Sequence, residues 1–160
     1  MIKAITESNF HDFWPTFSSI IDAQQSYALE PDMDINQAYE LWCKIPHKSY
    51  ALIEDGQVLG IYYLKANAMG PSKHICNCGY MVAEASRGRG VAKRMCEHSQ
   101  HQAKELGYLA MQFNNVVSTN TVAVSLWEKL GFSVIGTIPR AYNHKQYGYV
   151  DSFIMYKWLT

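Results

Sequence analysis

The sequence predicts one domain of mixed α/β layer architecture. The first observation is the order of expected elements, β-α-α-β-β-β-α-β-α-β-β. The second is the tight turn Asp55-Gly56 between two strand-like runs, and the third is a glycine-rich segment that joins a strand to an amphipathic helix. At 160 residues and 48% apolar composition, the chain can bury one sizeable core. We therefore expect a single domain over residues 1–160, in which a hairpin meander leads into a right-handed β-α-β crossover.

The N-terminal third predicts one strand and two helices. The strand is expected at 3–6, and the first helix at 7–25, where phenylalanine and tryptophan recur at mixed helical spacing. The second helix is expected to begin after Asp34, which is a good N-cap residue, and to end at Lys44.

The middle of the chain predicts three strands. Runs at 49–54 and 57–65 flank the Asp55-Gly56 turn, which is a strong hairpin signal. A longer strand is expected at 74–82, after a loop that contains Pro71.

The rest of the chain alternates between helix and strand. One helix places small and apolar residues on a single face and ends at Gly107; those residues are Ala92, Cys96, Ser99, Ala103 and Leu106. The remaining elements are expected as a strand at 108–114, a helix at 120–130 that ends at Gly131, and strands at 132–138 and 150–158.

Charge and composition exclude several classes of protein. Fourteen basic residues balance fourteen acidic ones, so no net charge attracts nucleic acid or an anionic membrane. No apolar run approaches the roughly 20 residues of a membrane-spanning helix, and residues 1–7 lack the apolar core of a secretory signal. The four cysteines form no CxxC pair, and His74-x-Cys76-x-Cys78 lacks a second ligand pair, so we expect reduced thiols, no metal and a cytoplasmic location.

The segment 82–92 carries the chemistry. It links a strand to a helix, whose first turn offers unpaired N–H groups and the positive end of the helix dipole. Arg87, Arg89, Lys93 and Arg94 add local positive charge, so the segment suits a diphosphate. It lacks the Gly-Lys-Ser/Thr ending of a P-loop and the spacing of a dinucleotide fingerprint. The alternative is a flexible cationic turn or an RNA-binding segment, and the zero net charge argues against RNA.

Two motifs carry a resemblance to a known family. The segment resembles the acetyl-coenzyme A (acetyl-CoA) signature of the GNAT acetyltransferase superfamily, Gln/Arg-x-x-Gly-x-Gly/Ala, through Arg87, Gly90 and Ala92. A second hallmark, Asn-x-x-Ala followed by an aromatic residue and a Gly-Phe ending, is similar to residues 120–123 and 127–132.

The resemblance implies a mostly antiparallel central sheet flanked by helices, in which the fourth and fifth strands splay apart. Acetyl-CoA is then the co-substrate, and its pantetheine arm pairs with the backbone of Met81 and Val82. Asn120 and Trp127 flank the thioester. The diphosphate lies beside Arg87 on the amides of Gly88, Arg89, Gly90, Val91, Ala92 and Lys93. Small acetyltransferases of this kind are often dimers, so a homodimer is also expected.

Acetyl transfer requires a neutral amine, and an alkyl amine has a pKa near ~10.4. Glu84, just past the splayed strand, is the candidate base, and His74 is a second; a solvated turn residue and a structural histidine are the alternatives. Many family members carry a tyrosine acid where this chain has Trp127, and an indole is not a useful acid. Tyr142 is the candidate substitute, with packing as the alternative.

The C-terminal half is also similar to fungal acetyltransferases of azetidine-2-carboxylate and other proline analogues. The residues that carry this similarity lie at 113–120, 136–139, 148–151 and 155–156. Asn77 and Asn114 are expected to face each other across the splay and to bind the substrate, and Asn77 joins Glu84 and Tyr142 as a candidate catalytic residue. Hydrogen bonds from both amides to the backbone are an equal alternative.

The expected function is N-acetyl transfer from acetyl-CoA to a small-molecule amine, an amino acid or analogue, by direct attack in a ternary complex. Two alternatives stay open. One is acetylation of a protein N-terminus or lysine. The other is a non-catalytic acyl-CoA sensor, which stays possible because Trp127 replaces the tyrosine acid of many family members.

Overall fold

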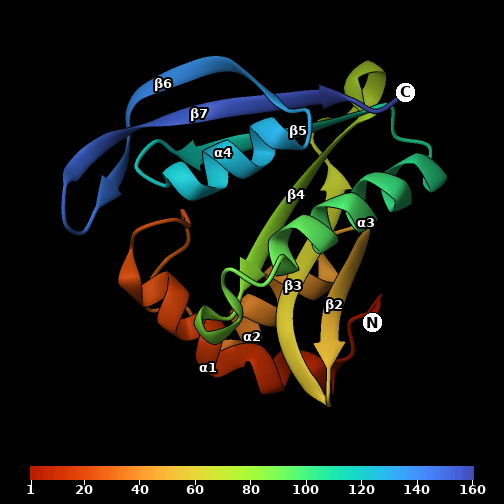
Figure 1. The fold of residues 1–160 in the computed structure, drawn as a ribbon, viewed down its shortest axis with the longest axis vertical. Helices are drawn as coiled ribbons and strands as arrows, with labels where there is room; N and C mark the ends of the chain where they lie inside the picture. The colour runs from red at the N-terminus through yellow and green to blue at the C-terminus, as the bar shows by residue number, and fades with distance from the viewer.

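The computed structural model describes residues 1–160 and contains one seven-stranded sheet in the order β1-β2-β3-β4-β5-β7-β6 (Figure 1). All neighbouring strands are antiparallel except β4 and β5, which are parallel. The strands are β1 (Ile2–Ala4), β2 (Lys48–Glu54), β3 (Gln57–Ala66), β4 (Ile75–Val82), β5 (Ala110–Val117), β6 (Ser133–His144) and β7 (Gly148–Trp158). The predicted order of elements and the predicted splay of the fourth and fifth strands are confirmed.

Four α-helices and three shorter turns of helix complete the fold. The helices are α1 (Glu7–Ala23), α2 (Ile35–Tyr39), α3 (Val91–Glu105) and α4 (Thr121–Lys129). The shorter turns are η1 (Glu40–Lys44), a π-helix that continues α2, and the 3-10 turns η2 (Gly70–Ser72) and η3 (Glu84–Ser86). None of the helices is both long and apolar enough to cross a membrane.

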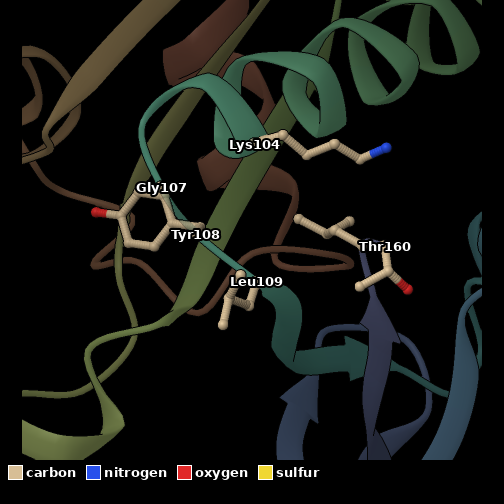
Figure 2. Close-up of a pocket in the computed structure, with 6 residues that line it drawn as sticks. Lys104, Gly107, Tyr108, Leu109 and Thr160 are labelled. Atoms are coloured by element: carbon tan, nitrogen blue, oxygen red, sulfur yellow. The ribbon is translucent and has the colours of Figure 1, made fainter.

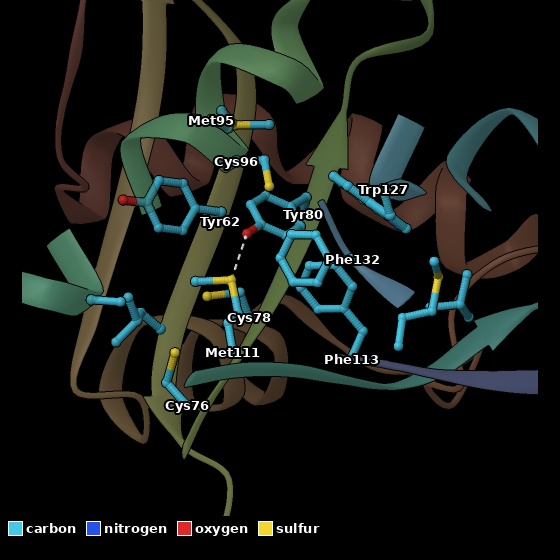
Figure 3. Packing of buried hydrophobic residues seen from close by; sticks show 14 of the residues in the cluster. Tyr62, Cys76, Cys78, Tyr80, Met95, Cys96, Met111, Phe113, Trp127 and Phe132 are labelled. Carbon is cyan, nitrogen blue, oxygen red and sulfur yellow. Dashed lines mark hydrogen bonds between the residues drawn. The ribbon is translucent and has the colours of Figure 1, made fainter. Parts of the chain in front are cut away.

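The sheet separates two hydrophobic cores. On one face, the aromatic side of α1 packs with Trp42 of η1 against Ala51, Ile61 and Met81. On the other face, α3 and α4 cover Tyr62, Tyr80 and other members of a larger core, together with three cysteine thiols (Figure 3). The four cysteines are unpaired. Because strand side chains alternate between faces, odd-numbered residues of β4 belong to the α1 side and even-numbered residues to the α3 side.

Capping residues set the start of both N-terminal helices. The Thr6 side chain accepts from the Asn9 amide and the Asn9 side chain accepts from the Thr6 amide, each at 3.1 Å. Asp34 and Gln37 form the same reciprocal pair at the start of α2, so the predicted Asp34 cap is confirmed. These side chains satisfy backbone N–H groups that have no partner within the helix.

Two predicted strand ends were too early. β5 continues to Val117 rather than ending at Asn114, and β6 continues to His144 rather than ending at Ile138. In both cases a bulge interrupts the alternation that the sequence pattern relies on. In β6 the bulge contains Arg140, which has a positive φ of 50° and donates its amide N–H to Asp151 Oδ1 at 2.9 Å.

Candidate active site

The site begins where β4 and β5 separate. The two strands pair at only two positions, Ile75 with Ala110 and Cys76 with Met111. Figure 1 shows them diverging from this shared start. The pairing of β4 with β3, in contrast, continues to Val82. One edge of β4 beyond Cys76 therefore has no strand partner.

The β3–β4 ladder decides which backbone groups face this gap. The Ala83 amide donates to the Leu59 carbonyl, and the Asn67 amide donates to the Ile75 carbonyl, each at 2.8 Å. In an antiparallel ladder only every second residue makes such bonds, so the odd-numbered residues of β4 bond to β3. The backbone groups of Cys78, Tyr80 and Val82 therefore point into the gap.

This alternation corrects one sequence-based expectation. Val82 faces the gap, as expected for a residue that pairs with pantetheine, but Met81 lies opposite Ile61 and directs its backbone groups to β3. Its side chain is 1% exposed in the α1-side core. Tyr80, and not Met81, directs its backbone groups into the gap, because the phase of the ladder depends on pairing with β3, which no local motif encodes.

Asn77 lies at the point where the strands part. Its Nδ2 donates to the Gln112 carbonyl at 2.9 Å, and its Oδ1 accepts from the Tyr63 hydroxyl at 3.0 Å. The side chain is 6% exposed. Of the two alternatives for Asn77, the backbone hydrogen bond is the one that the structure contains.

Asn114 lies on β5 and is exposed. Its Nδ2 donates to Asn67 Oδ1 at 2.7 Å, and its Oδ1 accepts from Gln112 Nε2 at 3.0 Å. Asn77 and Asn114 thus share Gln112 as a neighbour, but each binds a different part of it. Asn67, Asn77, Gln112 and Asn114 thus form one cluster of hydrogen-bonded amides beside the splay.

The glycine-rich segment after β4 has left-handed backbone at two glycines and leads into an uncapped helix. Gly88 and Gly90 have φ of 77° and 75°, and no side chain caps the start of α3 at Gly90. A left-handed backbone is favourable only for glycine, and an uncapped helix start leaves N–H groups available for an anion. Arg87, Arg89 and Lys93 are all exposed here, whereas the Val91 side chain is buried.

An acidic side chain lies beside this segment. Glu54 on β2 contacts Arg94 at 2.5 Å and Arg89 at 3.4 Å. The hydrogen bond from Arg94, together with the charges of Arg94 and Arg89, lowers the pKa of Glu54. Two of the cations expected at the diphosphate are therefore partly neutralised, whereas Arg87 and Lys93 have no acidic partner within 4.0 Å.

Trp127 and Asn120 lie on α4. Trp127 is 8% exposed and packs with Tyr80 and Phe113, with ring centroids 5.1 Å from each (Figure 3). Asn120 caps α4, because its Oδ1 accepts from the Ala123 amide at 3.3 Å. Trp127 therefore lies beside Tyr80, whose backbone faces the gap, while the Asn120 side chain is engaged in its own helix.

The proton-transfer candidates differ in environment. Glu84 is exposed in η3, directly after β4. Tyr142 is 6% exposed and donates its hydroxyl to the Tyr27 carbonyl at 3.0 Å, and burial raises its pKa. His74 contacts the Pro71 carbonyl at 3.2 Å on the far side of the β4–β5 pair, so it lies at the closed end of the splay.

Sequence reasoning missed Tyr27 and Tyr63. Tyr27 follows α1, lies 6.1 Å from the Trp42 ring and lines a surface hollow with Tyr142. Burial, followed by the charge of the Tyr63 phenol, raises the pKa of Tyr27. The alternation of side chains along the predicted strands could have indicated Tyr63, since it places Tyr63 on the same sheet face as Asn77. Tyr27 lies in a loop, where no local pattern indicates a role.

Comparison with known proteins gives the family. The model of the acetyltransferase (GNAT) family matches residues 7–132. The chain belongs to the GNAT acetyltransferase family. GNAT proteins use acetyl-CoA as the acyl donor.

Individual GNAT relatives agree with this assignment. The chain is 29% identical over 151 residues to the N-acetyltransferase aca1 of Schizosaccharomyces pombe, covering 94% of this chain and 66% of aca1. A GCN5-related N-acetyltransferase structure from Kribbella flavida has a TM-score of 0.93 and 38% identity, over 99% of this chain and 96% of that one. The yncA structure from Salmonella typhimurium, solved with its cofactor acetyl-CoA, has a TM-score of 0.84 at 16% identity and covers 100% and 94% of the two chains. The chain thus spans about two thirds of aca1.

The residues present fit acetyl-CoA. The free backbone groups of β4 suit the amides of a pantetheine arm, and the uncapped start of α3 suits a diphosphate.

A separate hollow near the C-terminus is lined by Lys104, Tyr108, Leu109 and others, and lies at the opposite end of α3 from the glycine-rich segment (Figure 2). No group of three or more histidine, cysteine or acidic side chains is arranged to hold a metal ion.

Proposed function

We propose that this GNAT domain transfers the acetyl group of acetyl-CoA to the amine of a small molecule, an amino acid or analogue, by direct attack in a ternary complex. The observation that carries the proposal is the continuous path from the free edge of β4 to the uncapped start of α3. Val82 ends that edge, and the segment with Gly88 and Gly90 follows it. When bound there, acetyl-CoA supplies the activated acyl group.

The acceptor side is the amide-lined opening of the splay. Asn77, Asn114 and Asn67 offer donors and acceptors that suit a carboxylate or an amide of a small substrate. Asn77 and Asn114 are the substrate-binding residues of this proposal, and the resemblance to fungal acetyltransferases of proline analogues supports an amino-acid acceptor.

Proton transfer involves two candidates with distinct roles. Glu84 is exposed directly after the splayed strand and can accept the amine proton through solvent. Tyr142 is the candidate donor to the thiolate, because its raised pKa keeps the phenol protonated. The matched changes Glu84→Gln and Tyr142→Phe test both: we expect each to lower kcat by about 10²-fold or more. An unchanged kcat would assign a structural role to the residue.

Measurement of thiol release from acetyl-CoA across amines, amino acids and short peptides tests the whole proposal. The control is the double variant Arg87→Glu/Gly90→Trp, which adds negative charge and forces an L-residue into a left-handed backbone. The space beside Gly90 is open, so the cost of the change comes from the backbone conformation and not from a steric clash, and a melting curve checks that the variant is folded. Release with one small amine, lost in the control, supports the proposal, whereas release with peptides alone would favour protein acetylation.

A non-catalytic acyl-CoA sensor is the second candidate function. The observation that favours it is Trp127, a buried indole beside Tyr80 where many GNAT enzymes have a tyrosine acid. Binding of acetyl-CoA without amine-dependent thiol release by any acceptor class would support this function and contradict the enzyme.

A homodimer is proposed on the exposed apolar residues of β6. Val134, Ile135 and Ile138 are 41%, 57% and 42% exposed on the outermost strand of the sheet. An exposed apolar edge strand favours association with another chain. Sedimentation equilibrium of the protein and of an Ile135→Lys variant tests this: the wild type should sediment as a dimer and the variant as a monomer. We also propose a cytoplasmic location, because the four cysteines are unpaired, and no nucleic-acid or membrane partner, because the chain has no net charge.

A further inference from the structure

The β4–β5 ladder stops at an identifiable hydrogen bond. The Ala110 amide donates to the His74 carbonyl at 3.3 Å, and the parallel register then continues through Cys76. In a regular parallel ladder the next bond would run from the Cys78 amide to the Gln112 carbonyl. No pairing of residue 77 with residue 112 is present, so that bond is not made.

The Asn77 side chain replaces the missing donor. Its Nδ2 donates to the same Gln112 carbonyl, at 2.9 Å. A carbonyl oxygen only accepts, so the nitrogen of the amide must face Gln112 and its oxygen must face Tyr63. The Asn77 side chain therefore occupies the acceptor that would otherwise continue the ladder.

Tyr63 holds this amide in one orientation. Its hydroxyl donates to Asn77 Oδ1 at 3.0 Å, and burial raises the pKa of Tyr63 to about 12, so the phenol keeps its proton at neutral pH. The ring of Trp42 packs edge-on against it at 4.8 Å and 87°. The phenol thus has little freedom to release the amide.

We infer that Asn77, held by Tyr63, is a positioning residue that ends the β4–β5 ladder and keeps the Cys78, Tyr80 and Val82 backbone groups free for the pantetheine arm. This role acts on the acyl donor, whereas the acceptor-binding role proposed above acts on the amine. The inference rests on the proposed use of acetyl-CoA.

Two ligands separate this role from a general structural one. Acetyl-CoA uses both the free β4 edge and the start of α3, whereas adenosine 3′,5′-diphosphate lacks the pantetheine arm. We therefore expect Asn77→Leu to weaken acetyl-CoA binding by about tenfold or more, equivalent to about 1.4 kcal/mol, in calorimetric titration. The affinity for adenosine 3′,5′-diphosphate should change by less than about twofold, because this ligand has no pantetheine arm to pair with β4.

A second variant distinguishes the loss of this hydrogen bond from misfolding of the Asn77→Leu protein. Tyr63→Phe keeps the ring and its packing but removes the donor to Asn77, so it should weaken acetyl-CoA binding in the same direction as Asn77→Leu. Tyr50→Phe is the matched control, because it removes one tyrosine hydroxyl, which donates to Gln102 at 2.8 Å on the other face of the sheet. The control should leave acetyl-CoA binding unchanged.

Amide hydrogen exchange gives a direct readout. Without ligand, the Cys78 amide should exchange quickly in the wild type and become protected in Asn77→Leu, because the ladder can then extend to Gln112. Unchanged acetyl-CoA affinity in both variants would overturn the inference. An equal loss of affinity for acetyl-CoA and for adenosine 3′,5′-diphosphate would also overturn it. None of these measurements needs turnover, so a failure of the proposed acetyl transfer is distinguishable from a failure of this role.

Discussion

The ring of Tyr63 lies directly against Gly79, so closely that a Cβ on Gly79 would sit 2.4 Å from Tyr63 Cε2. The two residues face each other across the β3–β4 ladder. Absence of a side chain at position 79 is thus what allows the phenol to lie flat along the strand and reach Asn77.

Gly79→Ala should therefore displace the Tyr63 ring and destabilise the protein. Forcing one extra methyl group into a packed position typically costs about 1–3 kcal/mol. Urea denaturation measures the loss. Gly136→Ala is the control, since its Cβ would lie 3.8 Å from Ile154 in ordinary contact, and it should change stability by less than about 0.5 kcal/mol. Equal effects of the two changes would contradict this account.

Gly90 should matter for acetyl-CoA beyond its backbone conformation. Gly90→Ala introduces a Cβ at φ 75°, which costs about 1–2 kcal/mol of stability, and it narrows the approach of a diphosphate to the start of α3. Gly56 in the β2–β3 turn has the same φ and equally open surroundings, so Gly56→Ala is a matched control. Both should lower the melting temperature, but only Gly90→Ala should weaken acetyl-CoA binding in calorimetry. A similar loss of affinity in both would remove Gly90 from the site.

Glu54→Gln should tighten the binding of acetyl-CoA. The carboxylate pairs with Arg94 and Arg89 and places negative charge beside the proposed diphosphate site. Its removal frees both cations, so we expect an affinity increase of about twofold to fivefold at low salt that disappears at high salt. Titrations at two salt concentrations check both the gain and its loss. Weaker binding in the variant would show that Glu54 orients the arginines for the ligand instead.

Stability should fall on mild acidification because of His98. Its Nδ1 lies 2.7 Å from the Tyr62 hydroxyl, and burial, followed by the charge of His101, lowers its pKa below the ordinary 6.5. The imidazole of His98 therefore binds a proton more readily in the unfolded chain than in the folded protein. Its contribution to the free energy of unfolding is present above pH 6.5 and is lost as the pH falls through the pKa of the folded state. Melting temperatures between pH 8 and pH 5, a range that spans the ordinary histidine pKa, should fall less steeply for His98→Gln than for the wild type. Parallel curves would assign the acid sensitivity to other groups.

Local patterns were sufficient for most of the fold. The Asp55-Gly56 turn, the Asp34 cap and the apolar face of the helix before Gly107 depend on residues close together in the chain, and each appears as expected. The glycine-rich segment after β4 belongs to the same class, because its conformation and its place before a helix are local properties. The later strand ends were misjudged, since the bulges near Asn114 and Arg140 form only against partner strands.

The sequence by itself determined the order of elements, the glycine-rich segment before α3 and the family, because these follow from spacing within short windows. Only the tertiary structure decided which β4 backbone groups face the gap and which side chain ends the β4–β5 ladder. Those properties depend on the phase of pairing with β3 and on the approach of Tyr63 over Gly79. Hydrogen bonds between segments distant in sequence set that phase, and no local pattern in β4 records it.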